Sequence, residues 1–205
     1  TITIADDASK GSVTIDAQSD DVYLDAADVT NAIDTISGGG FENLVANGSD
    51  VTVNVADTID TTTVNLTADA NVAEGGEITY TATIAGDKAP ENDVTVTLSN
   101  GETITIEAGK LSGSVTVDAP ADDVYADGET LSVTASVDSN DGNYENLVVG
   151  TGSTNSPVET VVGDTTDTVT ATLTADADAE GGEITYTVTL TDANGNEVKA
   201  DGPVS

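Results

Sequence analysis

The sequence predicts an all-β chain of tandem immunoglobulin-like β-sandwich domains, with about seven strands in each repeat of about 103 residues. The first observation is a period-two alternation of hydrophobic and polar residues along many short segments, which is typical of strands with one buried face. The second is an internal repeat as long as a whole domain, whereas solenoid repeats span about 20–50 residues. The Cys…Trp…Cys signature of antibody domains is absent, because the chain contains no cysteine and no tryptophan.

The alternating segments follow one another along the chain, and each combines threonine or serine with valine, isoleucine or leucine. Turn formers separate them, such as the Ser-Asn-Gly of residues 99–101 and the Ala-Gly-Lys of residues 108–110. Residues 25–36 predict one short helix. The expected strands are residues 1–4, 13–15, 51–55, 64–66, 78–84, 94–98, 103–106, 115–117 and 131–137.

The internal repeat consists of motifs that return in the same order. Residues 12–23 are echoed by 114–125, residues 41–45 by 144–148, and residues 74–81 return unchanged as 180–187. All aromatic residues fall into matched pairs across the repeat, which indicates core packing rather than a ligand platform. These pairs are Tyr23 with Tyr125, Phe41 with Tyr144, and Tyr80 with Tyr186.

Two polar segments, residues 56–61 and 163–168, are the expected linkers between repeats. Half a sandwich exposes its core face and its strand edges, so completion of partial units by fragments of two chains is a further hypothesis. The linkers divide the chain into residues 1–61 (the C-terminal part of one repeat), 62–164 (a complete repeat) and 165–205 (the N-terminal part of the next), and the alternative phase gives residues 1–102 and 103–205.

The chain is extremely acidic, with 38 aspartates and glutamates, four lysines, no histidine and a formal net charge of −34. Such a surface repels phosphates, so nucleic acid and anionic membrane surfaces are not expected partners. No apolar run is long enough to insert into a membrane. Charge of this size also destabilises a compact state through self-repulsion, which predicts that a cation neutralises the chain when it folds.

The absence of cysteine, histidine and methionine removes the usual ligands of zinc, copper and haem. It also removes the residues that most often act as nucleophile or base, so we expect no enzyme activity. Hard oxygen ligands remain. These are the ligands of calcium, which takes 6–8 oxygens in tolerant geometry, whereas magnesium demands near-octahedral order.

The acidic residues form three recurring clusters, and several carboxylates within about 5 Å repel one another unless a cation lies among them. We therefore expect calcium as a folding and stiffening ligand, with several ions per repeat; a solvated acidic turn is the alternative for any single cluster. The linker cluster is Asp57 and Asp60, matched by Asp164 and Asp167; the cluster after the first strand is Asp69 and Glu74, matched by Asp176, Asp178 and Glu180; the Asp-Asp-Val-Tyr cluster is Asp16, Asp20, Asp21 and Asp25, matched by Asp118, Asp122, Asp123 and Asp127.

Several of these motifs together resemble the extender repeats of giant RTX adhesins, which Gram-negative bacteria export by type I secretion for biofilm formation or ice binding. The resemblance implies tandem immunoglobulin-like sandwiches, linkers rigidified by calcium, and a location outside the cell on the bacterial surface. The calcium-binding nonapeptides of RTX tails are absent, which indicates a stalk segment. The motifs are residues 57–64, 74–83, 94–101, 113–117, 121–125 and 144–147.

The expected function is therefore a structural extender that projects a distal adhesive domain for surface attachment or biofilm formation, with neighbouring repeats of the same chain as partners. The alternative is a ligand-binding module for carbohydrate or ice, or a Calx-β-like calcium-binding module. A ligand site would show as a motif present in one copy of the repeat, and the sequence contains no convincing example.

Overall fold

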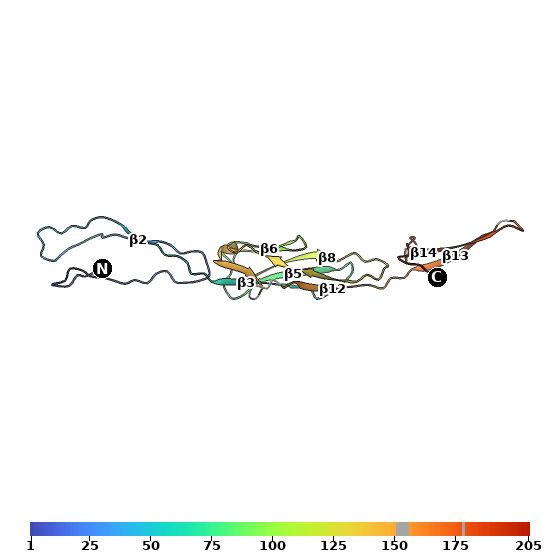
Figure 1. Cartoon of the computed structure of the whole chain (residues 1–205), viewed down its shortest axis with the longest axis horizontal. Coiled ribbons are helices and arrows are strands. Elements are labelled where there is room, and N and C mark those ends of the chain that lie inside the picture. The colour runs from blue at the N-terminus through green and yellow to red at the C-terminus, as the bar shows by residue number, and fades with distance from the viewer. Residues whose placement is uncertain (151–155, 178) are drawn as a thin grey trace.

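The structure is a computed structural model that describes residues 1–150, 156–177 and 179–205. The molecule is elongated, with a central sandwich between an N-terminal segment of long loops and a C-terminal hairpin on the opposite side (Figure 1). Strands account for nearly all its regular structure, and the helical content of the described ranges is one 3-10 turn, η1 (Asp141–Asn143). The predicted all-β fold class is confirmed.

The sandwich is built from ten strands, several of them short. They are β3 (Thr61–Ala68), β4 (Asn71–Ala73), β5 (Glu77–Ile84), β6 (Val94–Leu98), β7 (Thr103–Ile106), β8 (Ser112–Asp118), β9 (Glu129–Val133), β10 (Ala135–Ser136), β11 (Asn146–Val149) and β12 (Val158–Gly163). Outside it lie β1 (Val29–Asn31) and β2 (Val51–Val53) in the N-terminal segment, and β13 (Thr170–Ala177) and β14 (Ile184–Thr191) in the C-terminal hairpin.

One layer of the sandwich is the four-stranded sheet β11-β3-β5-β8, and the other combines the three-stranded sheets β10-β6-β7 and β4-β12-β9. The two smaller sheets are joined because β9 and β10 follow each other with an interruption at Thr134. Ser99 holds this interruption in place: its backbone N–H donates to the Thr134 carbonyl (2.9 Å), and the Thr134 N–H donates to the Ser99 hydroxyl (3.0 Å).

The core lies between these layers and follows the period-two alternation of the strands. In β5 the inward residues Ile78, Tyr80, Ala82 and Ile84 are all buried, whereas Glu77 and Thr83 are exposed. Burial of such side chains is the main favourable term in folding. The other buried hydrophobic residues are Val64, Val94, Val96, Leu98, Ile104, Ile106, Ala119, Val133, Ala135, Tyr144, Leu147 and Val162.

The hairpin β13-β14 contains the same sequence motif as β5 in a different environment. Ile184 is 59% exposed and Tyr186 is 66% exposed, whereas their counterparts Ile78 and Tyr80 are 0% and 1% exposed. The alternation therefore gives the same strand in both places, but in the described part of the chain no second sheet covers the hairpin.

The N-terminal segment keeps one recognisable element of a repeat. β1 pairs with β2 in antiparallel register, Val29 opposite Val53. The same register relates β9 to β12, where Leu131 lies opposite Thr160. The short helix predicted over residues 25–36 is therefore wrong: this stretch contains β1, because its β-branched residues pair with residues 51–53.

Two further expectations about this segment are wrong. Residues 1–4 and 13–15, all of them described, form no strand. Their counterparts are β7, which pairs with β6, and β8, which pairs with β5. In the described residues no segment supplies those partner strands to the N-terminal segment, and alternation without a partner does not make a sheet. Across the described residues no helix is long and apolar enough to cross a lipid bilayer.

Candidate metal centre

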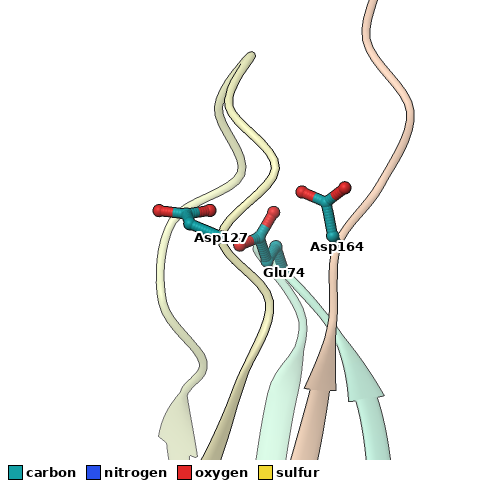
Figure 2. A group of neighbouring side chains, drawn as sticks. All are labelled: Glu74, Asp127 and Asp164. Carbon is teal, nitrogen blue, oxygen red and sulfur yellow. The ribbon is translucent and has the colours of Figure 1, made fainter. Parts of the chain in front are cut away.

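Three carboxylates from distant parts of the sequence meet at one end of the sandwich. Glu74, Asp127 and Asp164 each place a ligand oxygen within 4.8 Å of the others. Figure 2 shows them on three separate segments of the chain, with Asp164 just beyond the end of β12, where the chain leaves the sandwich. The sequence places one of them in each of the three predicted clusters, and the fold brings them together.

The sheet β4-β12-β9 positions all three side chains. β4 runs parallel to β12, with Ala73 opposite Gly163, so the next residues, Glu74 and Asp164, emerge side by side. The Glu74 N–H donates to the Gly163 carbonyl at 3.0 Å and fixes this end. β9 runs antiparallel to β12 and begins at Glu129, two residues after Asp127. Three strand ends therefore meet at one point.

The Glu-Gly-Gly turn aims the Glu74 side chain. Gly75 has a φ of +68°, which an L side chain rarely adopts, and its N–H donates to the Pro120 carbonyl at 2.7 Å. A Cβ on Gly76 would lie 2.8 Å from Val72 Cγ1, so this position has no room for a side chain. Backbone conformation and lack of space therefore explain the two glycines of the motif at this site.

Glu74 is buried in an unusual way for a carboxylate. It is 8% exposed, and its Oε2 has no hydrogen-bond partner among the described residues. Desolvation raises the pKa of Glu74; the hydrogen bond that the protonated Glu74 side chain can share with Asp127, and the negative charges of Asp127 and Asp164, raise it further, while the Thr165 backbone N–H lowers it. A bound cation would compensate the negative charge of this buried, unpaired carboxylate oxygen and of the two carboxylates next to it.

The chemistry of the donor set fits a hard divalent cation. All three side chains offer oxygen, and calcium completes its 6–8 ligands with backbone carbonyls and water. Three carboxylates at the ends of three segments suit the tolerant geometry of calcium better than the octahedral demand of magnesium.

Asp122 and Asp123 lie beside this group rather than within it. Asp122 Oδ1 accepts a hydrogen bond from the Thr165 hydroxyl, immediately after Asp164. Asp123 Oδ1 accepts from the Tyr125 backbone N–H at 2.7 Å and shapes the turn. Both residues hold the loop that presents Asp127, so they position the site.

The N-terminal segment contains the counterparts of two of these three carboxylates, Asp25 for Asp127 and Asp57 for Asp164. Asp57, the counterpart of Asp164, accepts hydrogen bonds at Oδ1 from the backbone N–H groups of Ala26 (2.9 Å) and Asp25 (3.4 Å). Asp20 accepts from the Thr58 hydroxyl, as Asp122 does from Thr165. Asp20, Asp21, Asp25 and Asp57 line one hollow. Burial, followed by the charges of Asp21, Asp57 and Glu91, raises the pKa of Asp25, while a hydrogen bond with Gln18 lowers it.

The remaining predicted ligands are not brought together in the described residues. Asp69 Oδ2 accepts from the Thr79 N–H at 2.8 Å and caps the β3–β5 connection instead of joining Glu74. Asp60 contributes its backbone N–H to Glu145 Oε2 at 2.7 Å. Asp178 lies outside the described residues. The exposed and ungrouped members are Asp16, Asp118, Asp167, Asp176 and Glu180.

Sequence reasoning missed Glu145, which is buried and receives the Asp60 N–H at the start of the sandwich. The available signal was its place in the Glu-Asn-Leu motif of residues 42–44 and 145–147. It also missed that one site takes a single residue from each acidic cluster, because only the pairing of β4, β9 and β12 shows this.

The family model of the LapA domain matches residues 1–58 and 60–165. LapA is a large adhesin of biofilm formation, and membership of an adhesin family indicates a location at the cell surface or outside the cell. The search of curated proteins found no match. Because the matched segments cover more than half of the sequence, the chain belongs to the LapA domain family of large adhesins associated with surface attachment and biofilm.

Proposed function

We propose that this chain is a calcium-rigidified extender segment, which holds a distal adhesive domain of a large adhesin away from the cell. The observation that carries the proposal is the buried, unpartnered Oε2 of Glu74, which faces two carboxylates at the point where the chain leaves the sandwich. The elongated arrangement of sandwich, N-terminal segment and hairpin supports it (Figure 1).

A cation at this site would act on the joint because the ligands belong to different parts of the chain. Glu74 and Asp127 belong to the sandwich, and Asp164 starts the segment that leaves it. Two unit charges at 4 Å repel by about 1 kcal/mol in water and by about 4 kcal/mol at an effective dielectric constant of 20. A divalent ion turns this repulsion into attraction and restrains the direction of the linker.

The same chemistry suits export in an unfolded state, as in the type I secretion of RTX adhesins. Without calcium, the net charge and the unpaired carboxylates oppose folding. Where calcium is plentiful, binding to the folded state alone stabilises it by about 2.7 kcal/mol for each site at 100 times Kd. Folding would then be confined to the outside of the cell.

Small-angle scattering in calcium and in excess chelator tests this function. We expect a longer, narrower particle in calcium, and a loss of most of that change in Asp164→Asn. Asp118→Asn is the matched control, because Asp118 is an exposed aspartate at the end of β8 and lies outside the group of three carboxylates.

Identical profiles in calcium and chelator would overturn the extender mechanism. Binding of this chain to a glycan array or to ice would instead favour the carbohydrate- or ice-binding alternative.

A further inference from the structure

We propose that the loop of residues 20–25, the docking loop, fixes the angle between successive units by direct contact with the end of the next sandwich. The proposal deepens the extender function and depends on it for its biological meaning. It assigns a role to the Asp-Asp-Val-Tyr motif that is separate from metal binding. The surface that it meets, the receiving loops, consists of residues 86–91 and 140–145.

Tyr23 is the centre of the contact. Its ring stacks on Tyr144 with a centroid distance of 5.6 Å and an interplanar angle of 24°. Its hydroxyl donates to the Ala89 carbonyl at 2.6 Å, and the Tyr144 hydroxyl donates to the adjacent Lys88 carbonyl at 2.7 Å. Two stacked tyrosines, one from each side of the joint, are thus anchored to consecutive carbonyls of one receiving loop.

The backbone adds a second set of constraints. The Leu24 N–H donates to the Asn143 carbonyl, and the Glu145 N–H donates to the Val22 carbonyl, both at 3.0 Å. These two bonds form an isolated antiparallel bridge between Tyr23 and Tyr144. Together, the stacked rings, the hydrogen bonds of the two tyrosine hydroxyls and the backbone hydrogen bonds of the bridge restrain both the direction and the rotation of the docking loop.

The receiving loops are a fixed part of the sandwich. The Thr95 N–H of β6 donates to Asp141 Oδ2 at 2.6 Å, and the Glu91 N–H donates to the Gly142 carbonyl at 3.0 Å, so the two receiving loops are held without any contact from the docking loop. Gly142 has a φ of +70°, and a Cβ there would lie 2.6 Å from Val94 Cγ2 and 2.8 Å from Pro90 Cβ. The loop therefore packs closely against the sandwich before the docking loop is added.

The hydroxyl contact and the turn that presents it recur at the opposite end of the sandwich. Tyr125, the repeat counterpart of Tyr23, donates its hydroxyl to the Lys199 carbonyl at 2.7 Å. The two acceptor residues, Lys199 for Tyr125 and Ala89 for Tyr23, both follow the second strand of a matching antiparallel pair, β13-β14 and β3-β5. The turns also agree, since the Tyr23 N–H donates to Asp21 Oδ1 at 2.8 Å and the Tyr125 N–H to Asp123 Oδ1 at 2.7 Å.

The central sandwich therefore carries the counterpart of the docking loop at one end and the receiving loops at the other, which allows the same joint to repeat along an array. Packing of Tyr23 within its own unit is the alternative. The structure favours docking, because the ring and hydroxyl contacts of Tyr23 go to Tyr144 and Ala89 of the sandwich.

The test uses the natural lack of cysteine, which makes site-directed spin labelling specific. Labels are placed on the full chain through Asn31→Cys in β1 and Thr105→Cys in β7, two exposed positions on either side of the joint. Pulsed dipolar spectroscopy then measures the distance distribution between them. We expect a narrow distribution that is lost in Tyr23→Ser, and an intermediate result in Tyr23→Phe, which keeps the stacked ring without the hydroxyl bond.

Tyr125→Ser is the matched control, and it should leave the distribution between residues 31 and 105 unchanged. Hydrogen exchange of the Glu145 amide gives an independent readout, because its acceptor is the Val22 carbonyl. We expect loss of its protection in Tyr23→Ser while amides inside β5 stay protected, which shows that the sandwich remains folded.

An unchanged distribution and unchanged Glu145 protection in Tyr23→Ser would overturn the docking proposal. Each measurement is made in calcium and in chelator. If calcium changes the distance distribution and Tyr23→Ser does not, docking is rejected and the proposed function stands. If Tyr23→Ser changes the distribution and calcium does not, docking stands and the calcium-dependent function is rejected.

Discussion

Glu74 shows how one side chain links folding to cation binding. Its Oε2 is buried without a hydrogen-bond partner among the described residues, and Asp127 and Asp164 lie next to it. The folded state without metal therefore binds a proton on Glu74 more tightly than the unfolded state does, because its pKa is raised above 4.5. Stability from this group is present at acidic pH and is lost as pH rises through the raised pKa.

Glu74→Gln removes the ionisable group and keeps its shape. In chelator at neutral pH we expect a higher melting temperature than that of the natural chain and a weaker fall in stability between pH 4.5 and 7. In calcium we expect most of the calcium-induced gain to be lost, because a ligand is missing. Thermal melts over pH, with and without calcium, measure both effects.

Glu102→Gln is the control for charge alone, since Glu102 is exposed and lies outside the group of three carboxylates. The same response in Glu102→Gln and Glu74→Gln would mean that net charge, not this site, governs stability.

At the scale of elements, β5 and β14 place the same Ile-Thr-Tyr-Thr sequence in two environments. In β5 the inward residues face a second sheet, whereas β14 pairs with β13 and stays largely exposed. The period-two pattern predicts a strand in both places. It cannot predict burial, because burial depends on which segments cover the strand.

Ile78→Ala in β5 should destabilise the sandwich by about 2–5 kcal/mol, because it leaves a cavity in a packed core. Ile184→Ala at the matched position of β14 should change stability by less than about 0.5 kcal/mol, as exposed substitutions usually do. Urea denaturation followed by circular dichroism compares the two variants. A large loss in Ile184→Ala would show that the hairpin is covered in solution, for example by a segment of a second chain.

The elements of the sandwich were the most predictable part of this chain. Residues 78–84, 94–98 and 103–106 form strands as expected, because alternation and turn formers agree there. Residues 1–4 and 13–15 show the same alternation but lack partner strands in the described residues. The repeat also identified Glu74, Asp127 and Asp164 as candidate ligands, whereas their meeting depends on the pairing of β4, β9 and β12.

At the scale of the whole molecule, charge and repetition act together. A net charge of −34 is spread over a long, narrow particle, so repulsion acts along its length (Figure 1). Monovalent salt screens charges over a Debye length of about 10 Å at 0.1 M, whereas a bound divalent ion acts within one site. General screening and specific binding of a divalent ion should therefore have different effects on stability.

Sodium chloride at 0.15 M in the presence of chelator should raise the melting temperature slightly, because screening weakens the long-range repulsion. The rise in melting temperature should be smaller than the rise that calcium causes at millimolar concentration. Differential scanning calorimetry at matched ionic strength measures this difference. Equal stabilisation by the two salts would show that screening alone is sufficient.

The most direct test of the central claim is thermal unfolding of this chain in calcium and in excess chelator. One saturated site at 100 times Kd contributes about 2.7 kcal/mol, and 1 kcal/mol shifts the melting temperature of a domain of about 100 residues by about 4–8 °C. We expect an unfolding midpoint that is higher by about 10–20 °C in calcium than in chelator. Superimposable curves in calcium and chelator would contradict it.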